Sequence, residues 1–201
     1  MSEKPTAVSE STSVPQPEIV DGRLLLRRMT SVDAPQVFRL INDREIASNT
    51  RSIPYPYPEP QASEWIESHA DLWDQGKSAI FGICLVSDST GQPELCGAIG
   101  LEINSEFEHA ELGYWIGREF WNQGICGEAA RILVDFGFEH LNLHRIHAHH
   151  LTRNPASGRV LEKAGMKFEG TLRHHIKKWG VFEDIAWYGI LRSEWQTVQT
   201  K

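Results

Sequence analysis

The chain has 201 residues, of which 40% are hydrophobic, 23% charged and 9% aromatic, enough apolar material for the core of one ordinary domain. This composition excludes a fibrous or mostly disordered chain. The 20 basic and 27 acidic residues give a formal charge of −7, which argues against a nucleic-acid partner because such surfaces need a basic face. No uncharged apolar run reaches the roughly 18 residues of a membrane span, and no secretory pattern follows Met1, so no membrane partner is expected.

The cysteines are an odd number and lack the spacing of metal ligands; they are Cys84, Cys96 and Cys126. They predict free thiols in a reduced, cytoplasmic protein, because disulfides persist mainly in oxidising compartments.

Residues 1–20 are rich in Ser, Pro, Glu and Thr and contain few large apolar side chains. This composition predicts a disordered tail, followed by a single domain over residues 21–197. Alternate prolines in 53–60 remove backbone donors and bias their neighbours to extended geometry. That segment is therefore expected to be a stiff, aromatic loop and not a helix.

Apolar runs bounded by turn residues predict a sheet with helices inserted in its second half. The expected strands are 23–27, 79–86, 95–103, 109–116, 145–151, 168–177 and 181–191. Helices are expected to start near Ser31 and Asp33, to span 64–75, and to flank the strand at 145–151. The three central strands should form an antiparallel meander and the last two a hairpin. The predicted fold class is α/β (α+β), a single domain with one central mixed, mostly antiparallel sheet.

The most informative segment runs from Gly113 to Arg131, where a strand leads through a loop with Gly124 and Gly127 into a helix. A small-residue loop before a helix presents free backbone N–H groups and the positive end of the helix dipole, which suits a pyrophosphate. The same spacing is also typical of a tight turn that uses glycine only for its backbone freedom.

A second segment opens with Asn154 and Pro155 and closes at Gly165. A capping residue, a proline at the first helical position and a glycine after the last predict a well-delimited helix, with Asn154 as its N-cap.

Together these segments resemble the GCN5-related N-acetyltransferases (GNAT), and within them the RimJ/RimL-type protein N-terminal acetyltransferases. The resemblance covers most of the chain from about residue 22. The matching motifs, in order, are Pro54-Tyr55-Pro56 with Trp65-Ile66, Glu111-Leu-Gly-Tyr-Trp, Phe120-Trp-Asn-Gln-Gly-Ile-Cys-Gly-Glu-Ala, Asn154-Pro-Ala-Ser157 with the helix to Gly165, and Leu191-Arg-Ser-Glu-Trp195. The resemblance implies a GNAT-like domain with helices on both faces of the sheet, and acetyl-CoA as the acyl donor.

The resemblance also implies which residues bind acetyl-CoA. Backbone amides would hold the pyrophosphate at Gln123, Gly124, Ile125, Cys126 and Gly127. The end of the preceding strand would splay from its neighbour and pair with the pantetheine arm through Trp115, Ile116 and Gly117. Asn154 would bind the same arm, and Ser157 would lie near the thioester sulfur.

Two positions depart from the general loop pattern of the family. Trp121 stands where that pattern has Gln or Arg, and Cys126 replaces the usual Gly or Ala. Because the cysteine side chain is small, the backbone contact is expected to survive.

Acetyl transfer needs a neutral amine and a base to neutralise it. At pH 7 this costs about 4.6 kcal/mol for a lysine amine but about 1 to 1.4 kcal/mol for an α-amine, so an N-terminal acceptor asks less of the base. Glu111, in the position of the subgroup's glutamate, is the predicted base, acting through water; the alternative is a solvated strand residue.

The departing thiolate needs a donor, and the thioester carbonyl needs a polarising group. Leu161 stands where many members of the superfamily have a tyrosine acid, which leaves Ser157 as the predicted donor. The backbone N–H near Ile116 is the candidate for polarising the carbonyl.

Four histidines between His144 and His150 raise the question of a metal site. On a strand, His147 and His149 share a face while His150 points away, and no cysteine or acidic residue is spaced with them. A structural or surface role without a metal is therefore expected.

The candidates for the acceptor groove are Tyr55, Tyr57, Trp65, Arg173 and His174. Tyrosines in a proline-rich loop also serve simple packing, so both roles stay open for them.

The predicted function is acetyl-CoA-dependent acetylation of a protein or peptide N-terminus by direct attack of its amine. A small amine such as an antibiotic, polyamine or amino acid is an alternative acceptor that the acidic charge would suit. A non-catalytic acyl-CoA-binding module is the alternative from another class. Exposed strand and aromatic surface would permit a homodimer, but nothing in the sequence requires one.

Overall fold

The computed structural model describes residues 14–86 and 91–199. Its strands are β1 Ile19–Asp21, β2 Leu24–Arg27, β3 Ser78–Val86, β4 Pro93–Asn104, β5 His109–Ile116, β6 Arg145–Leu151, β7 Lys167–Lys178 and β8 Val181–Leu191. Its α-helices are α1 Ala34–Ile41, α2 Arg44–Asn49, α3 Glu59–Asp74, α4 Ile125–His140, α5 Pro155–Lys163 and α6 Arg192–Gln199, and short 3-10 turns cover Ser31–Asp33 and Arg118–Phe120.

The described strands form one eight-stranded sheet in the order β1-β2-β3-β4-β5-β6-β8-β7. All neighbouring strands are antiparallel except β5 and β6, which are parallel because α4 connects them. The predicted central meander is β3-β4-β5 and the predicted hairpin is β7-β8. The mixed, mostly antiparallel sheet is therefore confirmed.

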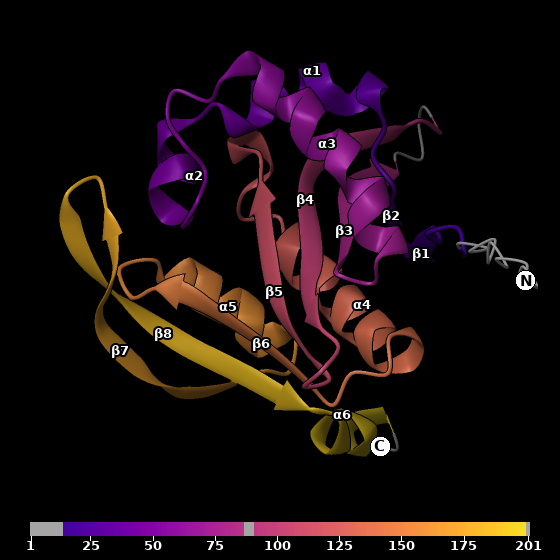
Figure 1. Cartoon of the computed structure of the whole chain (residues 1–201), viewed down its shortest axis with the longest axis vertical. Helices are drawn as coiled ribbons and strands as arrows, with labels where there is room; N and C mark the ends of the chain where they lie inside the picture. Colours follow the sequence, from indigo (N-terminus) through magenta and orange to yellow (C-terminus); the bar gives the residue numbers. More distant parts are fainter. Residues whose placement is uncertain (1–13, 87–90, 200–201) are drawn as a thin grey trace, which may run out of the picture.

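The parallel pair β5 and β6 is joined over a short stretch only. Its register runs from His109 opposite Arg145 to Glu111 opposite His147, and there it ends. Beyond that point the two strands diverge like the arms of a V, with α2 over the wide end (Figure 1). The carboxyl half of β5 thus has β4 on one side and an open edge on the other.

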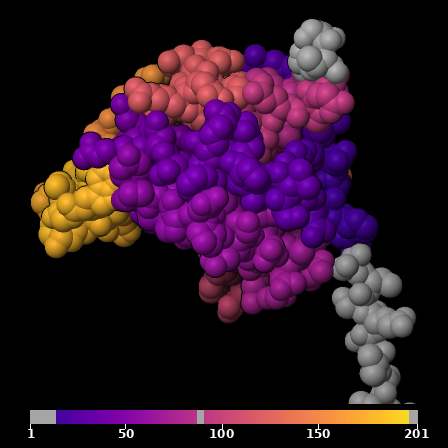
Figure 2. Space-filling model, turned by 90° about the horizontal axis from the view of Figure 1, so that it is seen from above, coloured from indigo at the N-terminus to yellow at the C-terminus, as the bar shows by residue number. Residues whose placement is uncertain are grey.

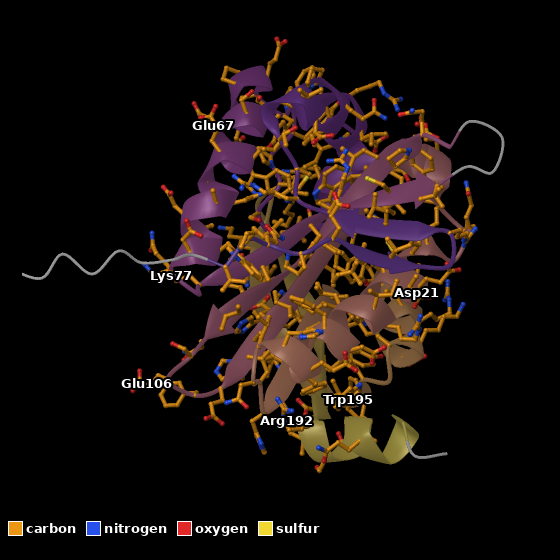
Figure 3. The ribbon with its side chains drawn as sticks, turned by 90° about the vertical axis from the view of Figure 1, so that its right-hand side faces the viewer. Asp21, Glu67, Lys77, Glu106, Arg192 and Trp195 are labelled. Atoms are coloured by element: carbon orange, nitrogen blue, oxygen red, sulfur yellow. The ribbon has the colours of Figure 1, made fainter. Side chains whose placement is uncertain are left out.

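Helices cover both faces of the sheet, as predicted. Figures 1 and 3 show α3 and α4 on opposite sides of the central strands. The Phe81 ring of β3 meets the Phe136 ring of α4 edge-on, with centroids 5.6 Å apart. On the other side, α3 buries Ala62 and Ile66. The apolar faces of two helices and a sheet thus form one continuous core.

The C-terminal helix α6 closes the lower end of the sheet (Figure 3). The indole N–H of Trp195 donates to the Asp135 carboxylate at 2.7 Å, and the Arg192 guanidinium donates to the Leu143 carbonyl at 2.8 Å. These bonds attach α6 to α4 and to the turn before β6. No helix in the described part of the chain is long and apolar enough to cross a bilayer.

Two elements differ from the prediction at the N-terminal end. Residues 14–20, assigned to a disordered tail, include the start of β1, and the Gln16 side chain donates to the Ile80 carbonyl at 2.7 Å. Residues 1–13, the rest of that predicted tail, lie outside the described residues. The helix α2 was not predicted, because its six residues carry too short an apolar pattern.

The prediction of a loop over the proline-rich segment 53–60 was wrong at its C-terminal end. Helix α3 begins at Glu59, five residues before its predicted start, and Pro60 lies in its first turn. Proline is tolerated there because the first N–H groups of a helix have no intrahelical acceptor.

Candidate active site

The loop between β5 and α4 ends in a left-handed turn at Gly124, whose φ is +80°. The first helical bonds run from the N–H groups of Gly127 and Glu128 to the Gly124 carbonyl. The N–H groups of Ile125 and Cys126 come before these, so helix geometry leaves them without intrahelical acceptors. A sixteen-residue helix adds the positive end of its dipole at this point, which suits a phosphate group.

The side chains around this loop hold it in place. Arg23 donates to the Gln123 carbonyl at 2.6 Å and to the Glu128 carboxylate at 2.7 Å. A Cβ on Gly127 would lie 3.3 Å from a side-chain carbon of Lys163, so this glycine also allows close packing of α4 on α5. Burial raises the pKa of the Cys126 thiol to about 12, which keeps it uncharged beside the N–H groups. The loop is therefore preorganised for an anion.

The open edge of β5 carries backbone groups at Tyr114 and Ile116. The Gly117 N–H donates to Cys96 of β4 at 2.8 Å, and backbone groups of successive strand residues point to alternate sides. The groups of Ile116 and Tyr114 consequently point away from β4. The indole N–H of Trp121 donates to the Ile116 carbonyl at 3.0 Å, while the Ile116 N–H is directed to the open edge. An extended ligand could pair with this edge as an added strand.

The predicted N-cap of α5 is confirmed. The Asn154 side chain accepts from the Ser157 N–H at 3.4 Å, and Pro155 opens the helix. The Ser157 hydroxyl in turn lies 2.6 Å from the Tyr114 hydroxyl, which also lies 3.2 Å from the Ser157 carbonyl. Burial raises the pKa of Tyr114, so the phenol stays protonated. Sequence reasoning missed this contact, because no local pattern signals a bond between residues 43 positions apart.

Glu111 lies on the face of β5 opposite to Tyr114. Its Oε1 lies 3.2 Å from Nδ1 of His149 on β6 and 3.5 Å from the Arg51 guanidinium. The imidazole is the largest influence that lowers the pKa of Glu111; burial opposes it, and the charge of Arg51 adds to it. Trp115, four residues after Glu111 on the same strand, shares this face and packs against Trp65 with ring centroids 6.5 Å apart.

The segment that carries Arg51 is fastened to the C-terminal hairpin. Lys178 donates to the Ile53 carbonyl at 3.0 Å, and the Arg44 guanidinium lies over the Trp179 ring at 5.4 Å. Arg153 adds a second tie, with bonds of 2.5 Å to the Ser48 carbonyl and 2.9 Å to Glu183 of β8. The hairpin projects from one side of the molecule (Figure 2), and these contacts link its tip to the segment beside Glu111.

The histidines of β6 face the two sides expected from strand alternation. His147 and His149 both stack on Trp187, with ring centroids 5.2 and 5.3 Å away. His147 Nε2 lies 3.3 Å from His109 Nδ1, whereas His150 packs on Tyr188 on the other side of the sheet. Among residues 14–86 and 91–199, no group of three or more His, Cys, Asp or Glu side chains is arranged to hold a metal ion.

The predicted acceptor residues lie in different settings. Tyr57 is only 6% exposed and packs in the core, whereas Tyr55 is 44% exposed. Tyr55 borders a polar hollow of about 330 Å³ whose other lining residues are Asn42, Asp43, Arg44, Glu45, Ser48 and Arg118. Arg173 and His174 are exposed on β7, where the His174 N–H donates to Asp184 at 2.7 Å. Only Trp65 is joined by a described contact to the face that carries Glu111.

Residues 23–167 match the family model of the acetyltransferase (GNAT) domain. The chain is 32% identical over 182 residues to the uncharacterized N-acetyltransferase YoaA of Bacillus subtilis, covering 88% of this chain and 97% of that protein. It is 30% identical over 186 residues to the putative ribosomal N-acetyltransferase YdaF of the same organism, covering 88% and 96%.

A solved structure shares both the fold and part of the sequence. The spermidine N-acetyltransferase of Vibrio cholerae, solved with CoA and spermine, aligns with a TM-score of 0.73 and 26% identity, over 87% of this chain and 98% of that one. The glycine turn at the start of α4 and the open edge of β5 fit the acetyl-CoA that this family uses. The chain belongs to the GNAT family and is an acetyl-CoA-dependent N-acetyltransferase.

Proposed function

We propose that this enzyme acetylates the α-amine of a protein or peptide N-terminus. The setting of Glu111 carries the proposal: His149 and Arg51 hold the pKa of this carboxyl below its usual value. A carboxylate with a low pKa is a weak base. An α-amine costs about 3 kcal/mol less to neutralise at pH 7 than a lysine-type amine, so it is the better match.

Local charge supports the same acceptor class. Although the whole chain is acidic, the half-exposed Arg51 guanidinium lies 3.5 Å from Glu111. An acceptor with several positive charges would meet this cation, whereas a peptide N-terminus brings one charge and loses it before reaction. The similarity to YdaF, a putative ribosomal N-acetyltransferase, points the same way.

In the proposed mechanism, acetyl-CoA supplies the thioester, with its pyrophosphate at the N-terminus of α4 and its pantetheine arm along the open edge of β5. Backbone N–H groups of Gln123, Gly124, Ile125 and Cys126 bind the pyrophosphate, and Asn154 binds the arm; the Gly127 N–H, also expected there, donates to the Gly124 carbonyl instead. The Ile116 N–H donates to the thioester oxygen and so stabilises the charge that develops there.

The acceptor amine first loses a proton towards Glu111 through water, and its nitrogen then attacks the acetyl carbon. The carbon–sulfur bond breaks, the nitrogen gives up its second proton, and the sulfur gains a proton through the Ser157 hydroxyl, which donates its own and is restored by the one that the nitrogen releases. A thiolate is a tolerable leaving group, since a thiol has a pKa of about 8.5, so a weak donor is sufficient.

A small amine is the second candidate acceptor. The 26% identity to a spermidine N-acetyltransferase over nearly its full length, together with the net charge of −7, favours it. The two candidates use the same donor site and differ only in what approaches Glu111.

Release of free thiol from acetyl-CoA tests the proposal. Peptides that differ only in their first residue are compared with the same peptides blocked at the α-amine, and with spermidine and aminoglycosides. Thiol release with free peptides that blocking abolishes is the expected result; release with small amines alone would replace the proposed acceptor by the second candidate. Absence of release with every acceptor, with acetyl-CoA still raising the melting temperature, would favour a binding module.

A further inference from the structure

Glu111 and His149 form a carboxylate–imidazole pair on the acceptor side of the sheet. The 3.2 Å between Oε1 and Nδ1 is an ion-pair distance, and His149 is only 10% exposed at its side chain. Its Nδ1 is buried and has no well-aligned hydrogen bond to any described residue. The carboxylate is thus the nearest acidic group to a nitrogen that becomes a good donor only when it carries a proton.

We propose that His149 is the group on which the acceptor's proton comes to rest, while Glu111 stays ionised and orients the imidazole. The proton leaves the amine nitrogen and is taken up by the pair, which becomes an imidazolium whose Nδ1–H donates to the Glu111 carboxylate. This inference rests on the proposed function. It also gives Glu111 a role that suits its lowered pKa, because a carboxylate that stays ionised can orient an imidazole and balance its charge.

The surroundings distinguish His149 from its neighbour on the same face. His147 Nε2 is engaged with His109 Nδ1 at 3.3 Å, and burial lowers the pKa of His147, which favours its neutral form. His149 instead points a nitrogen at a carboxylate. Both rings stack on Trp187, which fixes their planes.

The charged and titratable groups around the His149 ring come from three places. Glu111 faces it from β5, Arg51 from the segment after α2 lies beside that carboxylate, and His147 lies two residues before it on β6. The indole of Trp187 covers it from β8. Among these, Glu111 alone is acidic, so the imidazolium depends on this one carboxylate.

The first test needs no acceptor. The ring nitrogens of His149 are assigned by nitrogen NMR in the wild type and in Glu111→Gln, with His147 as the internal reference. Loss of the carboxylate should change the Nδ1 signal of His149 by more than any ring nitrogen signal of His147, because Nδ1 faces the carboxylate in the wild type. An unchanged Nδ1 signal in the variant would overturn the pair.

The second test uses whichever amine the wild type acetylates, so failure of the proposed acceptor does not touch it. His149→Phe keeps a ring against Trp187 but removes the nitrogens that take up a proton. His149→Gln removes the imidazole ring altogether and leaves an amide, which is not a base. His147→Gln is the matched control on the same face. The His149 variants should lose about 100-fold or more in kcat/KM and the acid limb of the pH profile, with acetyl-CoA binding retained. An unchanged pH profile in both His149 variants, equal to that of His147→Gln, would refute the inference.

Discussion

The Tyr114 hydroxyl lies 2.6 Å from the Ser157 hydroxyl and bridges the central strand β5 to the first turn of α5. When the phenol donates to the serine oxygen, the serine proton is free to point elsewhere. Since burial raises the pKa of Tyr114, the phenol stays a donor throughout any practical assay range. Tyr114 is therefore a positioning residue for Ser157.

Removing this hydroxyl should lower kcat more than it changes KM for acetyl-CoA. We expect Tyr114→Phe and Ser157→Ala each to reduce kcat by about 5- to 20-fold, because one aligned hydrogen bond contributes about 1 to 2 kcal/mol. The double variant should be no slower than the slower single variant. Initial rates at saturating acetyl-CoA measure this, and multiplicative losses in the double variant would show that the two hydroxyls act independently.

The left-handed turn at Gly124 should control donor affinity. Gly124→Ala places a Cβ at φ +80°, at a cost of about 1 kcal/mol or more, and disturbs the N–H groups before α4. We expect the KM for acetyl-CoA to rise about tenfold. Gly76→Ala is the matched control: its φ is +64° with open space around it, so it should lower the melting temperature without raising that KM. Equal KM values in the two variants would contradict the assigned loop.

Arg51 should bias the choice of acceptor. Its guanidinium lies 3.5 Å from Glu111 and is half exposed, so its effect is modest and salt-dependent. We expect Arg51→Gln to raise kcat/KM for spermidine relative to a neutral peptide by about two- to fivefold at low ionic strength. Arg159→Gln, on the exposed side of α5, is the control. A ratio that stays constant would remove Arg51 from acceptor selection.

Asp33 should make stability depend on pH in the acid range. Burial alone would raise the pKa of Asp33, but the Arg27 guanidinium, 2.7 Å away, and the Thr30 N–H together lower it. Because the folded value lies below the unfolded value of about 3.9, the stabilisation is complete above that pH and is lost as the pH falls through the folded value. Asp33→Asn should cost about 2 kcal/mol at pH 7 and progressively less below pH 4. Urea unfolding of the wild type and of Asp33→Asn, at pH 7 and below pH 4, measures this. A stability difference between the two proteins that does not shrink in acid would contradict the assignment.

The sequence predicted the sheet well because strand and turn signals are local. The order β3-β4-β5, the hairpin β7-β8 and the helix cap at Asn154 all follow from patterns within about a dozen residues. The elements that it missed, β1, α2 and α6, have three, six and eight residues, and each is bonded to a residue far along the chain, as in Asp21 with Arg131, Glu45 with Arg118 and Trp195 with Asp135. Such elements owe their formation to tertiary contacts and not to propensity.

The site was predictable along β5 and not across it. Glu111 and the loop before α4 are visible in the sequence, whereas the approach of Arg51 and His149 to Glu111 depends on which strands and loops become neighbours. The contact between Tyr114 and Ser157 was unpredictable for the same reason. On sequence Tyr114 is one aromatic residue in an apolar strand, and its partner belongs to a helix two elements later.

The two side-chain faces of β5 and its open backbone edge point in three different directions. In the proposed mechanism the Glu111 and Trp115 side chains face the acceptor and the amide edge beyond the short ladder with β6 takes the donor, while Tyr114 contacts Ser157. Because that edge recognises its ligand through main-chain atoms, the side chains on either face can diverge without loss of the donor. This separation lets one scaffold change its acceptor while keeping the same acyl donor.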